Sequence, residues 1–148
     1  MPKVVIANDH GAVELASIFI EHLYESGYDV NHLGVKDIQS VDYPDMAKLA
    51  CEEYKRGGYD FGILLCGTGI GISISANKIE GIRCALPQNS YAASMARRHN
   101  DVNFIAFGGR IDYSEDPVDM LQAFMDASFE GDRHQRRVDK MMDLEKSC

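Results

Sequence analysis

The sequence lacks several features that mark large classes of protein. No run approaches the ~20 consecutive apolar residues that a membrane-spanning helix needs. The four cysteines contain no CxxC pair, so their spacing gives no sign of a metal site. Positive charge is scarce, with 15 lysines and arginines against 23 acidic residues and a net charge of -8. This balance argues against a general nucleic-acid binder, which needs a basic surface to release counterions.

We also expect no secretory signal, because the first ten residues reach a charge too soon. We therefore expect a cytoplasmic protein whose cysteines are reduced thiols. No internal repeat, linker or low-complexity segment interrupts the chain, so we expect residues 1–148 to form a single domain. The apolar fraction of 45% is ordinary for such a domain.

Short β-rich runs alternate with helical patterns along the whole chain. Strands are predicted at 3–7, 28–33, 61–65, 82–86 and 103–107, and helices at 13–26, 44–56, 72–77, 90–98, 117–129 and 133–144, the last capped by Asp132. This alternation predicts a three-layer α/β/α Rossmann-like domain with a five-stranded, mostly parallel sheet. Ligands of such sheets bind beyond the carboxyl ends of the strands. Function should therefore lie in segments 8–11, 34–44, 66–71, 87–89 and 108–110.

Residues 66–71, Cys-Gly-Thr-Gly-Ile-Gly, form the most informative segment. A buried strand delivers a thiol to a glycine-rich turn, and a helix follows directly. The unpaired amides at a helix start attract negative charge, so they should lower the pKa of Cys66 from ~8.5 toward neutrality. The glycine spacing is neither the dinucleotide fingerprint GxGxxG nor a P-loop. A buried cysteine at a strand end is often simple packing, so the cysteine alone leaves both interpretations open.

Acids and imidazoles recur near other strand and helix ends. Asp9 and His10 end the first predicted strand, where they suit hydroxyl binding or proton transfer, although Asp9 could equally cap the first helix. His99 follows a predicted helix end, where an imidazole can serve either the helix dipole or catalysis.

Arginines crowd the second half of this acidic chain. Arg133 and Arg137 are four residues apart on a predicted helix and share one face, which makes a fork that fits a phosphate. Arg110, after two glycines, is a third candidate. Each of them could instead be a solvated or ion-paired surface group.

These motifs resemble the ribose-5-phosphate isomerase B family, which also includes galactose-6-phosphate and allose-6-phosphate isomerases. The resemblance rests on 66–71 and on further segments in the family's order: 9–10, 42–44, 76–78, 81–83, 99–100, 107–110 and 131–137. It covers essentially the whole chain. It implies interconversion of D-ribose 5-phosphate and D-ribulose 5-phosphate through an enediolate, a step of the pentose phosphate pathway, without cofactor or metal.

The resemblance also implies a role for each matching residue. Cys66 would be the base that moves a proton between C1 and C2, and His99, helped by Asp9, would open the sugar ring. The sugar oxygens and the enediolate would be held by Thr68 and the amides of Gly67, Gly69, Ile70 and Gly71. The phosphate would be bound by His10, Arg110, Arg133 and Arg137. Asn100 would reach the neighbouring subunit's site, which implies a homodimer or homotetramer with shared active sites and a C-terminal helix packed on the partner subunit.

Two alternatives stay open on the sequence. A six-carbon substrate, allose 6-phosphate or galactose 6-phosphate, would need the same chemistry, and the loop 34–44 would set the pocket length. His99 and the arginines together favour ribose 5-phosphate over galactose 6-phosphate. A non-catalytic sugar-phosphate sensor would keep the pocket and bind its ligand without turnover.

Overall fold

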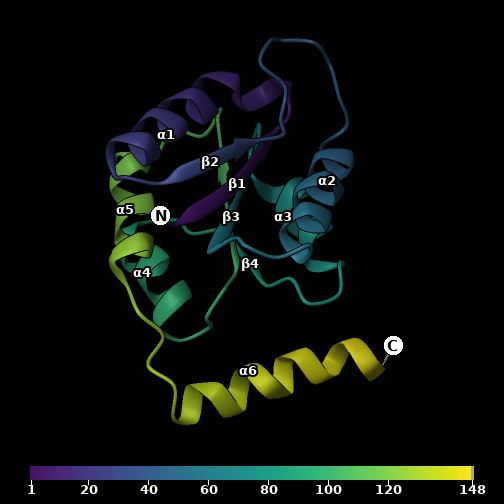
Figure 1. Cartoon of the computed structure of the whole chain (residues 1–148), viewed down its shortest axis with the longest axis vertical. Helices are drawn as coiled ribbons and strands as arrows, with labels where there is room; N and C mark the ends of the chain where they lie inside the picture. Colours follow the sequence, from purple (N-terminus) through teal and green to yellow (C-terminus); the bar gives the residue numbers. More distant parts are fainter. Residues whose placement is uncertain (148) are drawn as a thin grey trace.

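A computed structural model describes residues 1–147 and shows a parallel sheet between layers of helices (Figure 1). The strands are β1 (Lys3–Asn8), β2 (Asp29–His32), β3 (Phe61–Cys66), β4 (Cys84–Ala85) and β5 (Phe104–Gly108). Their order is β2-β1-β3-β5-β4, and every neighbouring pair is parallel. The central strand, β3, is the near-continuous apolar run, as expected of a strand buried on both faces. The predicted α/β/α architecture is confirmed.

Helices cover both faces of the sheet (Figure 1). One face packs against α1 (Val13–Glu25), α4 (Ser90–Arg98) and α5 (Pro117–Asp126), and the other against α2 (Tyr43–Lys55) and α3 (Ile70–Asn77). A single 3-10 turn, η1 (His10–Ala12), precedes α1. Because side chains alternate along a strand, Leu65 packs into the core on the α1, α4 and α5 side, and Cys66 packs into the core on the α2 and α3 side. The thiol therefore faces the α2 and α3 layer.

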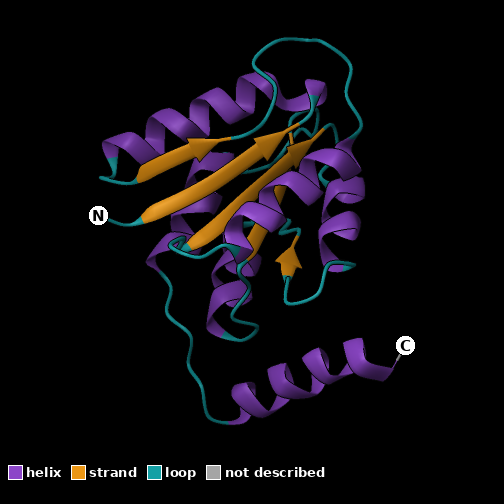
Figure 2. Ribbon diagram, turned by 45° about the vertical axis from the view of Figure 1, so that its right-hand side comes forward, coloured by secondary structure: helices purple, strands orange, loops and turns teal. Residues whose placement is uncertain are grey.

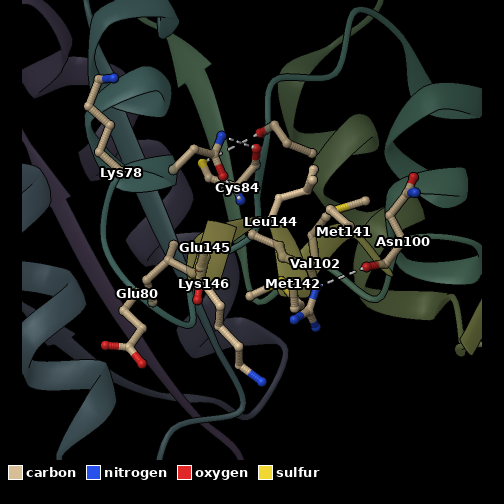
Figure 3. A pocket seen from close by; sticks show the side chains of 14 residues that line it. Lys78, Glu80, Cys84, Asn100, Val102, Met141, Met142, Leu144, Glu145 and Lys146 are labelled. Carbon is tan, nitrogen blue, oxygen red and sulfur yellow. Dashed lines mark hydrogen bonds between the residues drawn. The ribbon is translucent and has the colours of Figure 1, made fainter. Parts of the chain in front are cut away.

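The last helix, α6 (Arg133–Asp143), lies outside both layers and is followed by η2 (Leu144–Ser147). The arrowheads of the central strands point away from α6 (Figure 2). Hydrogen bonds tie this part of the chain to the body at two places, from the N–H of Glu130 to the carbonyl of Arg98 at 3.0 Å and from the N–H of Gly81 to Oε1 of Glu145 at 3.0 Å. Between α6 and segment 77–85 lies a groove of about 1020 Å³, with Met141, Met142 and Leu144 on the helix side (Figure 3).

Two predicted elements prove three residues shorter than expected. α5 ends at Asp126 and not at Phe129, because Ala127 adopts extended backbone with ψ 153° as the chain leaves for α6. β4 keeps only 84–85 of the predicted 82–86. The amides before it are used elsewhere: Ile82 donates to Ile79 in a turn, and Arg83 donates to the side chain of Asn103.

The predicted cap of the last helix is also wrong in its chemistry. Asp132 occupies the N-cap position of α6, but its side chain makes no capping hydrogen bond. Its backbone lies at φ 49° and ψ -126°, whereas a capping side chain reaches the first-turn amides from extended backbone. By contrast, Asn89 has extended backbone and accepts from the N–H of Ala92 at 2.8 Å, so it caps α4.

Among residues 1–147, no helix combines the length and the apolar character that a membrane crossing demands. The three cysteines in this range, Cys51, Cys66 and Cys84, are free thiols, as predicted. The same prediction for Cys148 falls outside the described residues.

Candidate functional site

The thiol of Cys66 lies at the junction of β3 and α3. Its Sγ accepts a hydrogen bond from the N–H of Gly69 at 3.2 Å, and Gly69 is the N-cap residue of α3. This residue has φ 78°, and a Cβ at its position would meet the backbone carbon of Phe107 at 2.8 Å. Position 69 therefore requires glycine, both for its conformation and for space. The turn holds a backbone donor against the sulfur of a residue that is only 4% exposed.

Backbone contacts bring the ends of β1, β3 and β5 together around this thiol. The N–H of Asp9 donates to the carbonyl of Leu65 at 3.0 Å, and the N–H of Arg110 donates to that of Gly67 at 2.9 Å. The turns approach so closely that a Cβ on Gly11 would lie 2.9 Å from the nitrogen of Gly67. The prediction that segments 8–11, 66–71 and 108–110 share one edge of the sheet is confirmed. We call residues 9–10, 66–71 and 110 the Cys66 cluster.

Asp9 and His10 are both held by backbone donors. Oδ1 of Asp9 accepts from the N–H of Gly11 at 2.8 Å, so the carboxylate caps η1, which is the structural interpretation that the sequence left open. Nδ1 of His10 accepts from the N–H of Val41 at 3.2 Å. A neutral imidazole that accepts at Nδ1 carries its proton on Nε2, so His10 offers a donor to an anionic oxygen.

The exposed polar side chains of the Cys66 cluster are those of Arg110 and Thr68. The guanidinium of Arg110 lies against Gly67, where a Cβ would meet Nη1 at 3.4 Å. The hydroxyl of Thr68 accepts from the N–H of Ile70 at 3.2 Å. Together with the backbone amides of the turn, these groups provide a cation and several hydrogen-bond donors for an anionic, hydroxyl-rich ligand.

Asn8, which sequence reasoning passed over, supports this edge from within. Its Nδ2 donates to the carbonyls of Asp9 at 3.0 Å and Val35 at 2.9 Å, and its Oδ1 lies 2.7 Å from Nε2 of His32. Asn8 is fully buried. Burial lowers the pKa of His32, which keeps its ring neutral beside this amide. His32 is thus structural, and the network joins β1, β2 and the loop after β2.

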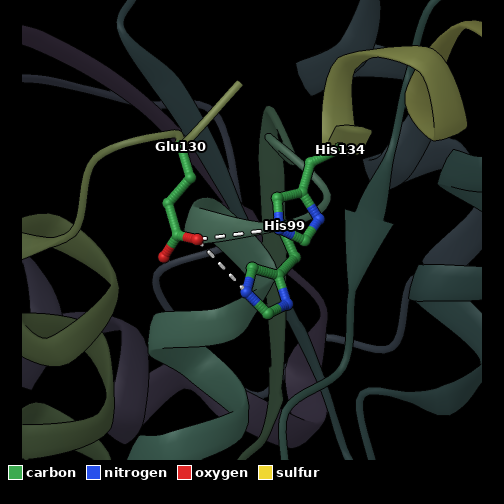
Figure 4. A group of neighbouring side chains, drawn as sticks. All are labelled: His99, Glu130 and His134. Carbon is green, nitrogen blue, oxygen red and sulfur yellow. Dashed lines mark ion pairs between the residues drawn. The ribbon is translucent and has the colours of Figure 1, made fainter. Parts of the chain in front are cut away.

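The remaining predicted residues gather elsewhere, around a pair of stacked imidazoles (Figure 4). The ring of His99, at the end of α4, stacks on the ring of His134 in α6 with centroids 4.0 Å apart and planes at 10°. Oε1 of Glu130 lies 3.5 Å from Nε2 of His99 and 3.6 Å from Nε2 of His134. Oε2 of Glu130 accepts from Nε of Arg98 at 2.6 Å. We call His99, Asn100, Glu130, Arg133, His134 and Arg137 the His99 cluster.

Three side chains of this cluster, His99, Glu130 and His134, place one potential metal ligand atom each within 4.8 Å of one another. The ring geometry does not fit a shared ion. A zinc ion would need to lie ~2.1 Å from each nitrogen and close to each ring plane, and two parallel rings 4.0 Å apart cannot both meet this requirement. The arginine on the second carboxylate oxygen weakens the site further as a cation ligand.

Within one chain the two clusters do not meet. Cys66 ends β3, whereas α4 returns the chain to the start of β5, so His99 lies toward the opposite end of the sheet. Arg133 and Arg137 are exposed on α6, on the side from which the strands point away (Figure 2). Asp9, which was expected to help His99, lies with Cys66. The two could act together only across a subunit boundary.

Comparison with known proteins agrees with the resemblance seen in the sequence. Residues 4–141 match the Ribose/Galactose Isomerase family. Ribose-5-phosphate isomerase B of Escherichia coli is 39% identical over 145 residues, which cover 98% of this chain and 97% of that one.

Solved structures of ribose-5-phosphate isomerase B are also similar to this chain. Ribose-5-phosphate isomerase B of Clostridium thermocellum matches with a TM-score of 0.93 at 43% identity and covers 98% of each chain. The Mycoplasma genitalium enzyme, solved with bound ribulose-5-phosphate, matches with a TM-score of 0.91 at 36% identity and covers 99% of this chain and 97% of that one. The similarity therefore extends over nearly the full length of both partners in each comparison.

Proposed function

Because the chain belongs to the ribose/galactose isomerase family, we propose that it is an aldose–ketose isomerase that interconverts D-ribose 5-phosphate and D-ribulose 5-phosphate. The observation that carries the proposal is the sulfur of Cys66, held 3.2 Å from the amide of Gly69 at the start of α3. Relatives named ribose-5-phosphate isomerase B support the choice of substrate, and one of them holds ribulose 5-phosphate. We place the activity in the cytoplasm and in the pentose phosphate pathway.

The chemistry needs one base that can serve two adjacent carbons. The thiolate of Cys66 removes the C2 proton of the open-chain aldose. The electron pair of that C–H bond forms a double bond between C2 and C1, and the negative charge moves to O1, which gives an enediolate. The same sulfur returns the proton to C1 while a proton passes from O2 to O1, which leaves a ketone at C2. The oxidation of C2 and the reduction of C1 balance within one molecule, so no redox cofactor is required. Thr68 and the turn amides hold the charge that develops on the sugar oxygens.

Binding of the phosphate and opening of the sugar ring require residues of both clusters. In this proposal His10 and Arg110 bind the phosphate from one subunit, and the partner subunit's Arg133 and the partner subunit's Arg137 bind it from the other. The partner subunit's His99 opens the furanose ring, with Asp9 of the first subunit nearby. The separation of the clusters within one chain supports this shared arrangement. Each chain, 1–148, then acts as one domain of a homodimer, or of a homotetramer built from two such dimers.

The position of α6 supports the same dimer. It lies outside the helical layers, and Met141 in this helix and Leu144 directly after it are 40% and 64% exposed. We propose that this helix packs on the partner subunit and carries the phosphate-binding arginines to the partner's Cys66 cluster.

The test is isomerase activity of the variant Cys66→Ala. We expect turnover to fall by about 10³-fold, within the range that a general base supplies. Binding of ribose 5-phosphate, measured by calorimetry, should remain within a few-fold of wild type, since the phosphate contacts are intact. Activity equal to wild type would exclude Cys66 as the base.

A matched control is Cys51→Ala. Cys51 is fully buried in α2 and is not a member of the Cys66 cluster, and burial raises the pKa of its thiol to about 12. This variant should retain full turnover, which would show that loss of a buried sulfur alone is not responsible. Measuring kcat/KM of the wild type on ribose 5-phosphate and on allose 6-phosphate separates the five-carbon from the six-carbon substrate, and binding without turnover of either would indicate a sensor.

A further inference from the structure

We propose that Glu130 and His134 are positioning residues for His99, which fix the plane and the tautomer of its ring for sugar ring opening. The inference rests on the proposed isomerase function and concerns two residues that the function has not yet used. It follows from the geometry around the stacked imidazoles (Figure 4).

The ring of His134 forms a flat surface on which the ring of His99 stacks. Its own exposure is only 6%, and its Nε2 is buried without a hydrogen-bond partner among the described residues. Its contact with Oε1 of Glu130, at 3.6 Å, is longer than a hydrogen bond, so this contact alone does not fix the ring. What His134 does make is a parallel contact, with centroids 4.0 Å apart and planes at 10°. This contact restricts rotation of the His99 ring about its own side chain.

Glu130 selects which nitrogen of His99 carries the proton. Arg98 holds Oε2 of Glu130 at 2.6 Å, so Oε1 is the oxygen that faces the ring at 3.5 Å. A carboxylate can only accept, and Nε2 of His99 must therefore present its N–H. Nδ1 is then the free base. The 3.5 Å separation is long for a hydrogen bond, but contacts of catalytic groups commonly tighten when the substrate binds.

The charges of Glu130 and His134 suit the roles proposed for them. The hydrogen bond from Arg98 lowers the pKa of Glu130, so the carboxylate stays anionic. Burial lowers the pKa of His134, and the neighbouring His99 and Arg133 add to the effect. One ring of the stack is thereby kept neutral. The stack therefore avoids two cations in contact.

The ring-opening step balances with these roles. Nδ1 of His99 takes the proton from the C1 hydroxyl as the bond between C1 and the ring oxygen breaks. A proton returns from His99 to that oxygen, which becomes the C4 hydroxyl. Ribulose 5-phosphate needs no such step, because its C5 oxygen is phosphorylated and it stays an open chain. A defect in positioning His99 should therefore affect the two substrates differently.

The decisive variant is Glu130→Gln. Arg98 will keep the amide oxygen of the new side chain, so its NH₂ group turns toward Nε2 of His99 and favours the opposite tautomer. We expect kcat/KM for ribose 5-phosphate to fall about ten- to hundredfold, as for other residues that orient a functional histidine. The initial rate with ribulose 5-phosphate should change by less than about threefold, because the variant can release the open-chain aldose and leave ring closure to solution. The ¹⁵N shifts of the His99 ring should report the change of tautomer.

A matched control is Glu53→Gln, another glutamate paired with an arginine, at 2.8 Å from Arg56 on the remote helix α2. It should leave both rates unchanged. The stacking role is tested by rescue: His134→Phe keeps a flat ring and should retain most of the ribose 5-phosphate activity, whereas His134→Ala should lose it.

Several outcomes would overturn the inference while leaving the isomerase function intact. Equal loss in both directions for Glu130→Gln, or no loss in either, would remove the positioning role of the glutamate. Equal activities of His134→Phe and His134→Ala would remove that of the ring. Saturable Zn²⁺ binding by the wild type, lost in Glu130→Gln, would assign the group to a metal. A wild-type chain that isomerises neither substrate would instead contradict the proposed function itself.

Discussion

Gly69 links the stability of the fold to the chemistry of the site. Its backbone lies at φ 78°, its Cα faces the backbone of Phe107 and the side chain of Leu86, and its N–H donates to Sγ of Cys66. A side chain at this position would force the turn away from β5. The amide at the sulfur would move with it.

Gly69→Ala should lower the free energy of unfolding by about 3 kcal/mol, from a left-handed backbone penalty and an added steric clash. Gly27→Ala is the matched control, because Gly27 has φ 86° and a Cβ added there would meet nothing within 4 Å. It should lose only about 1 kcal/mol, from the backbone penalty alone. Urea denaturation of both variants measures the difference, and equal losses would show that the contact with β5 is unimportant.

At the scale of single residues, the sequence allowed the prediction of site residues that belong to a local motif. It did not allow the prediction of site residues that belong to none. Cys66 and the glycines after it form one continuous motif between a strand and a helix. Glu130 gave no such signal, because its partners Arg98 and His99 lie far earlier in the chain, Arg98 by 32 residues, and meet it only in the folded protein.

At the scale of elements, the ends of α4 and α6 use different physical means. Asn89 caps α4 with a side-chain hydrogen bond from extended backbone. Asp132 starts α6 at φ 49° and ψ -126°, without such a bond. The first end gains stability from its side chain, and the second holds a residue in a conformation that suits glycine.

The two positions should therefore respond in opposite directions. Asn89→Ala should lower the free energy of unfolding by about 1 kcal/mol, through loss of the cap. Asp132→Gly should raise it by about 0.5–1 kcal/mol, since relief of strain exceeds the added entropy of the unfolded chain. Thermal unfolding followed by circular dichroism would measure both. A fall in stability of Asp132→Gly would mean that the aspartate makes a contact worth more than the strain.

Element prediction succeeded where a stop signal stands in the sequence. α1 ends one residue before the Ser26–Gly27 turn, and the Asp116–Pro117 pair starts α5 as predicted. Nothing at 127–129 marks the end of α5, because that end is set by the path of the chain back to Arg98. The strand order β2-β1-β3-β5-β4 was likewise beyond local patterns, since it depends on which strands pair across the whole chain.

At the scale of the whole molecule, the Cys66 and His99 clusters occupy opposite ends of one sheet. In the proposed dimer with shared sites, two chains with different defects should therefore complement each other. In a mixed dimer of Cys66→Ala with the double variant Arg133→Ala/Arg137→Ala, one site receives both defects and the other receives none.

Coexpression of the two variants should restore about one quarter of wild-type activity, because half of randomly formed dimers are mixed and each has one intact site of two. Each variant alone, assayed at low substrate concentration, is the control. Differential tags on the two chains would allow the mixed species to be purified and counted. Failure of purified mixed dimers to exceed either parent would place all the groups of a site on one chain.

If Cys66 and His99 act in one shared site, as proposed, the activity of the chain depends on its own concentration. Dilution below the dissociation constant of that proposed dimer would abolish activity by separating the two clusters. Below that concentration the amount of active dimer would rise with the square of the number of chains in the cell. Halving expression would therefore lower the flux by far more than half.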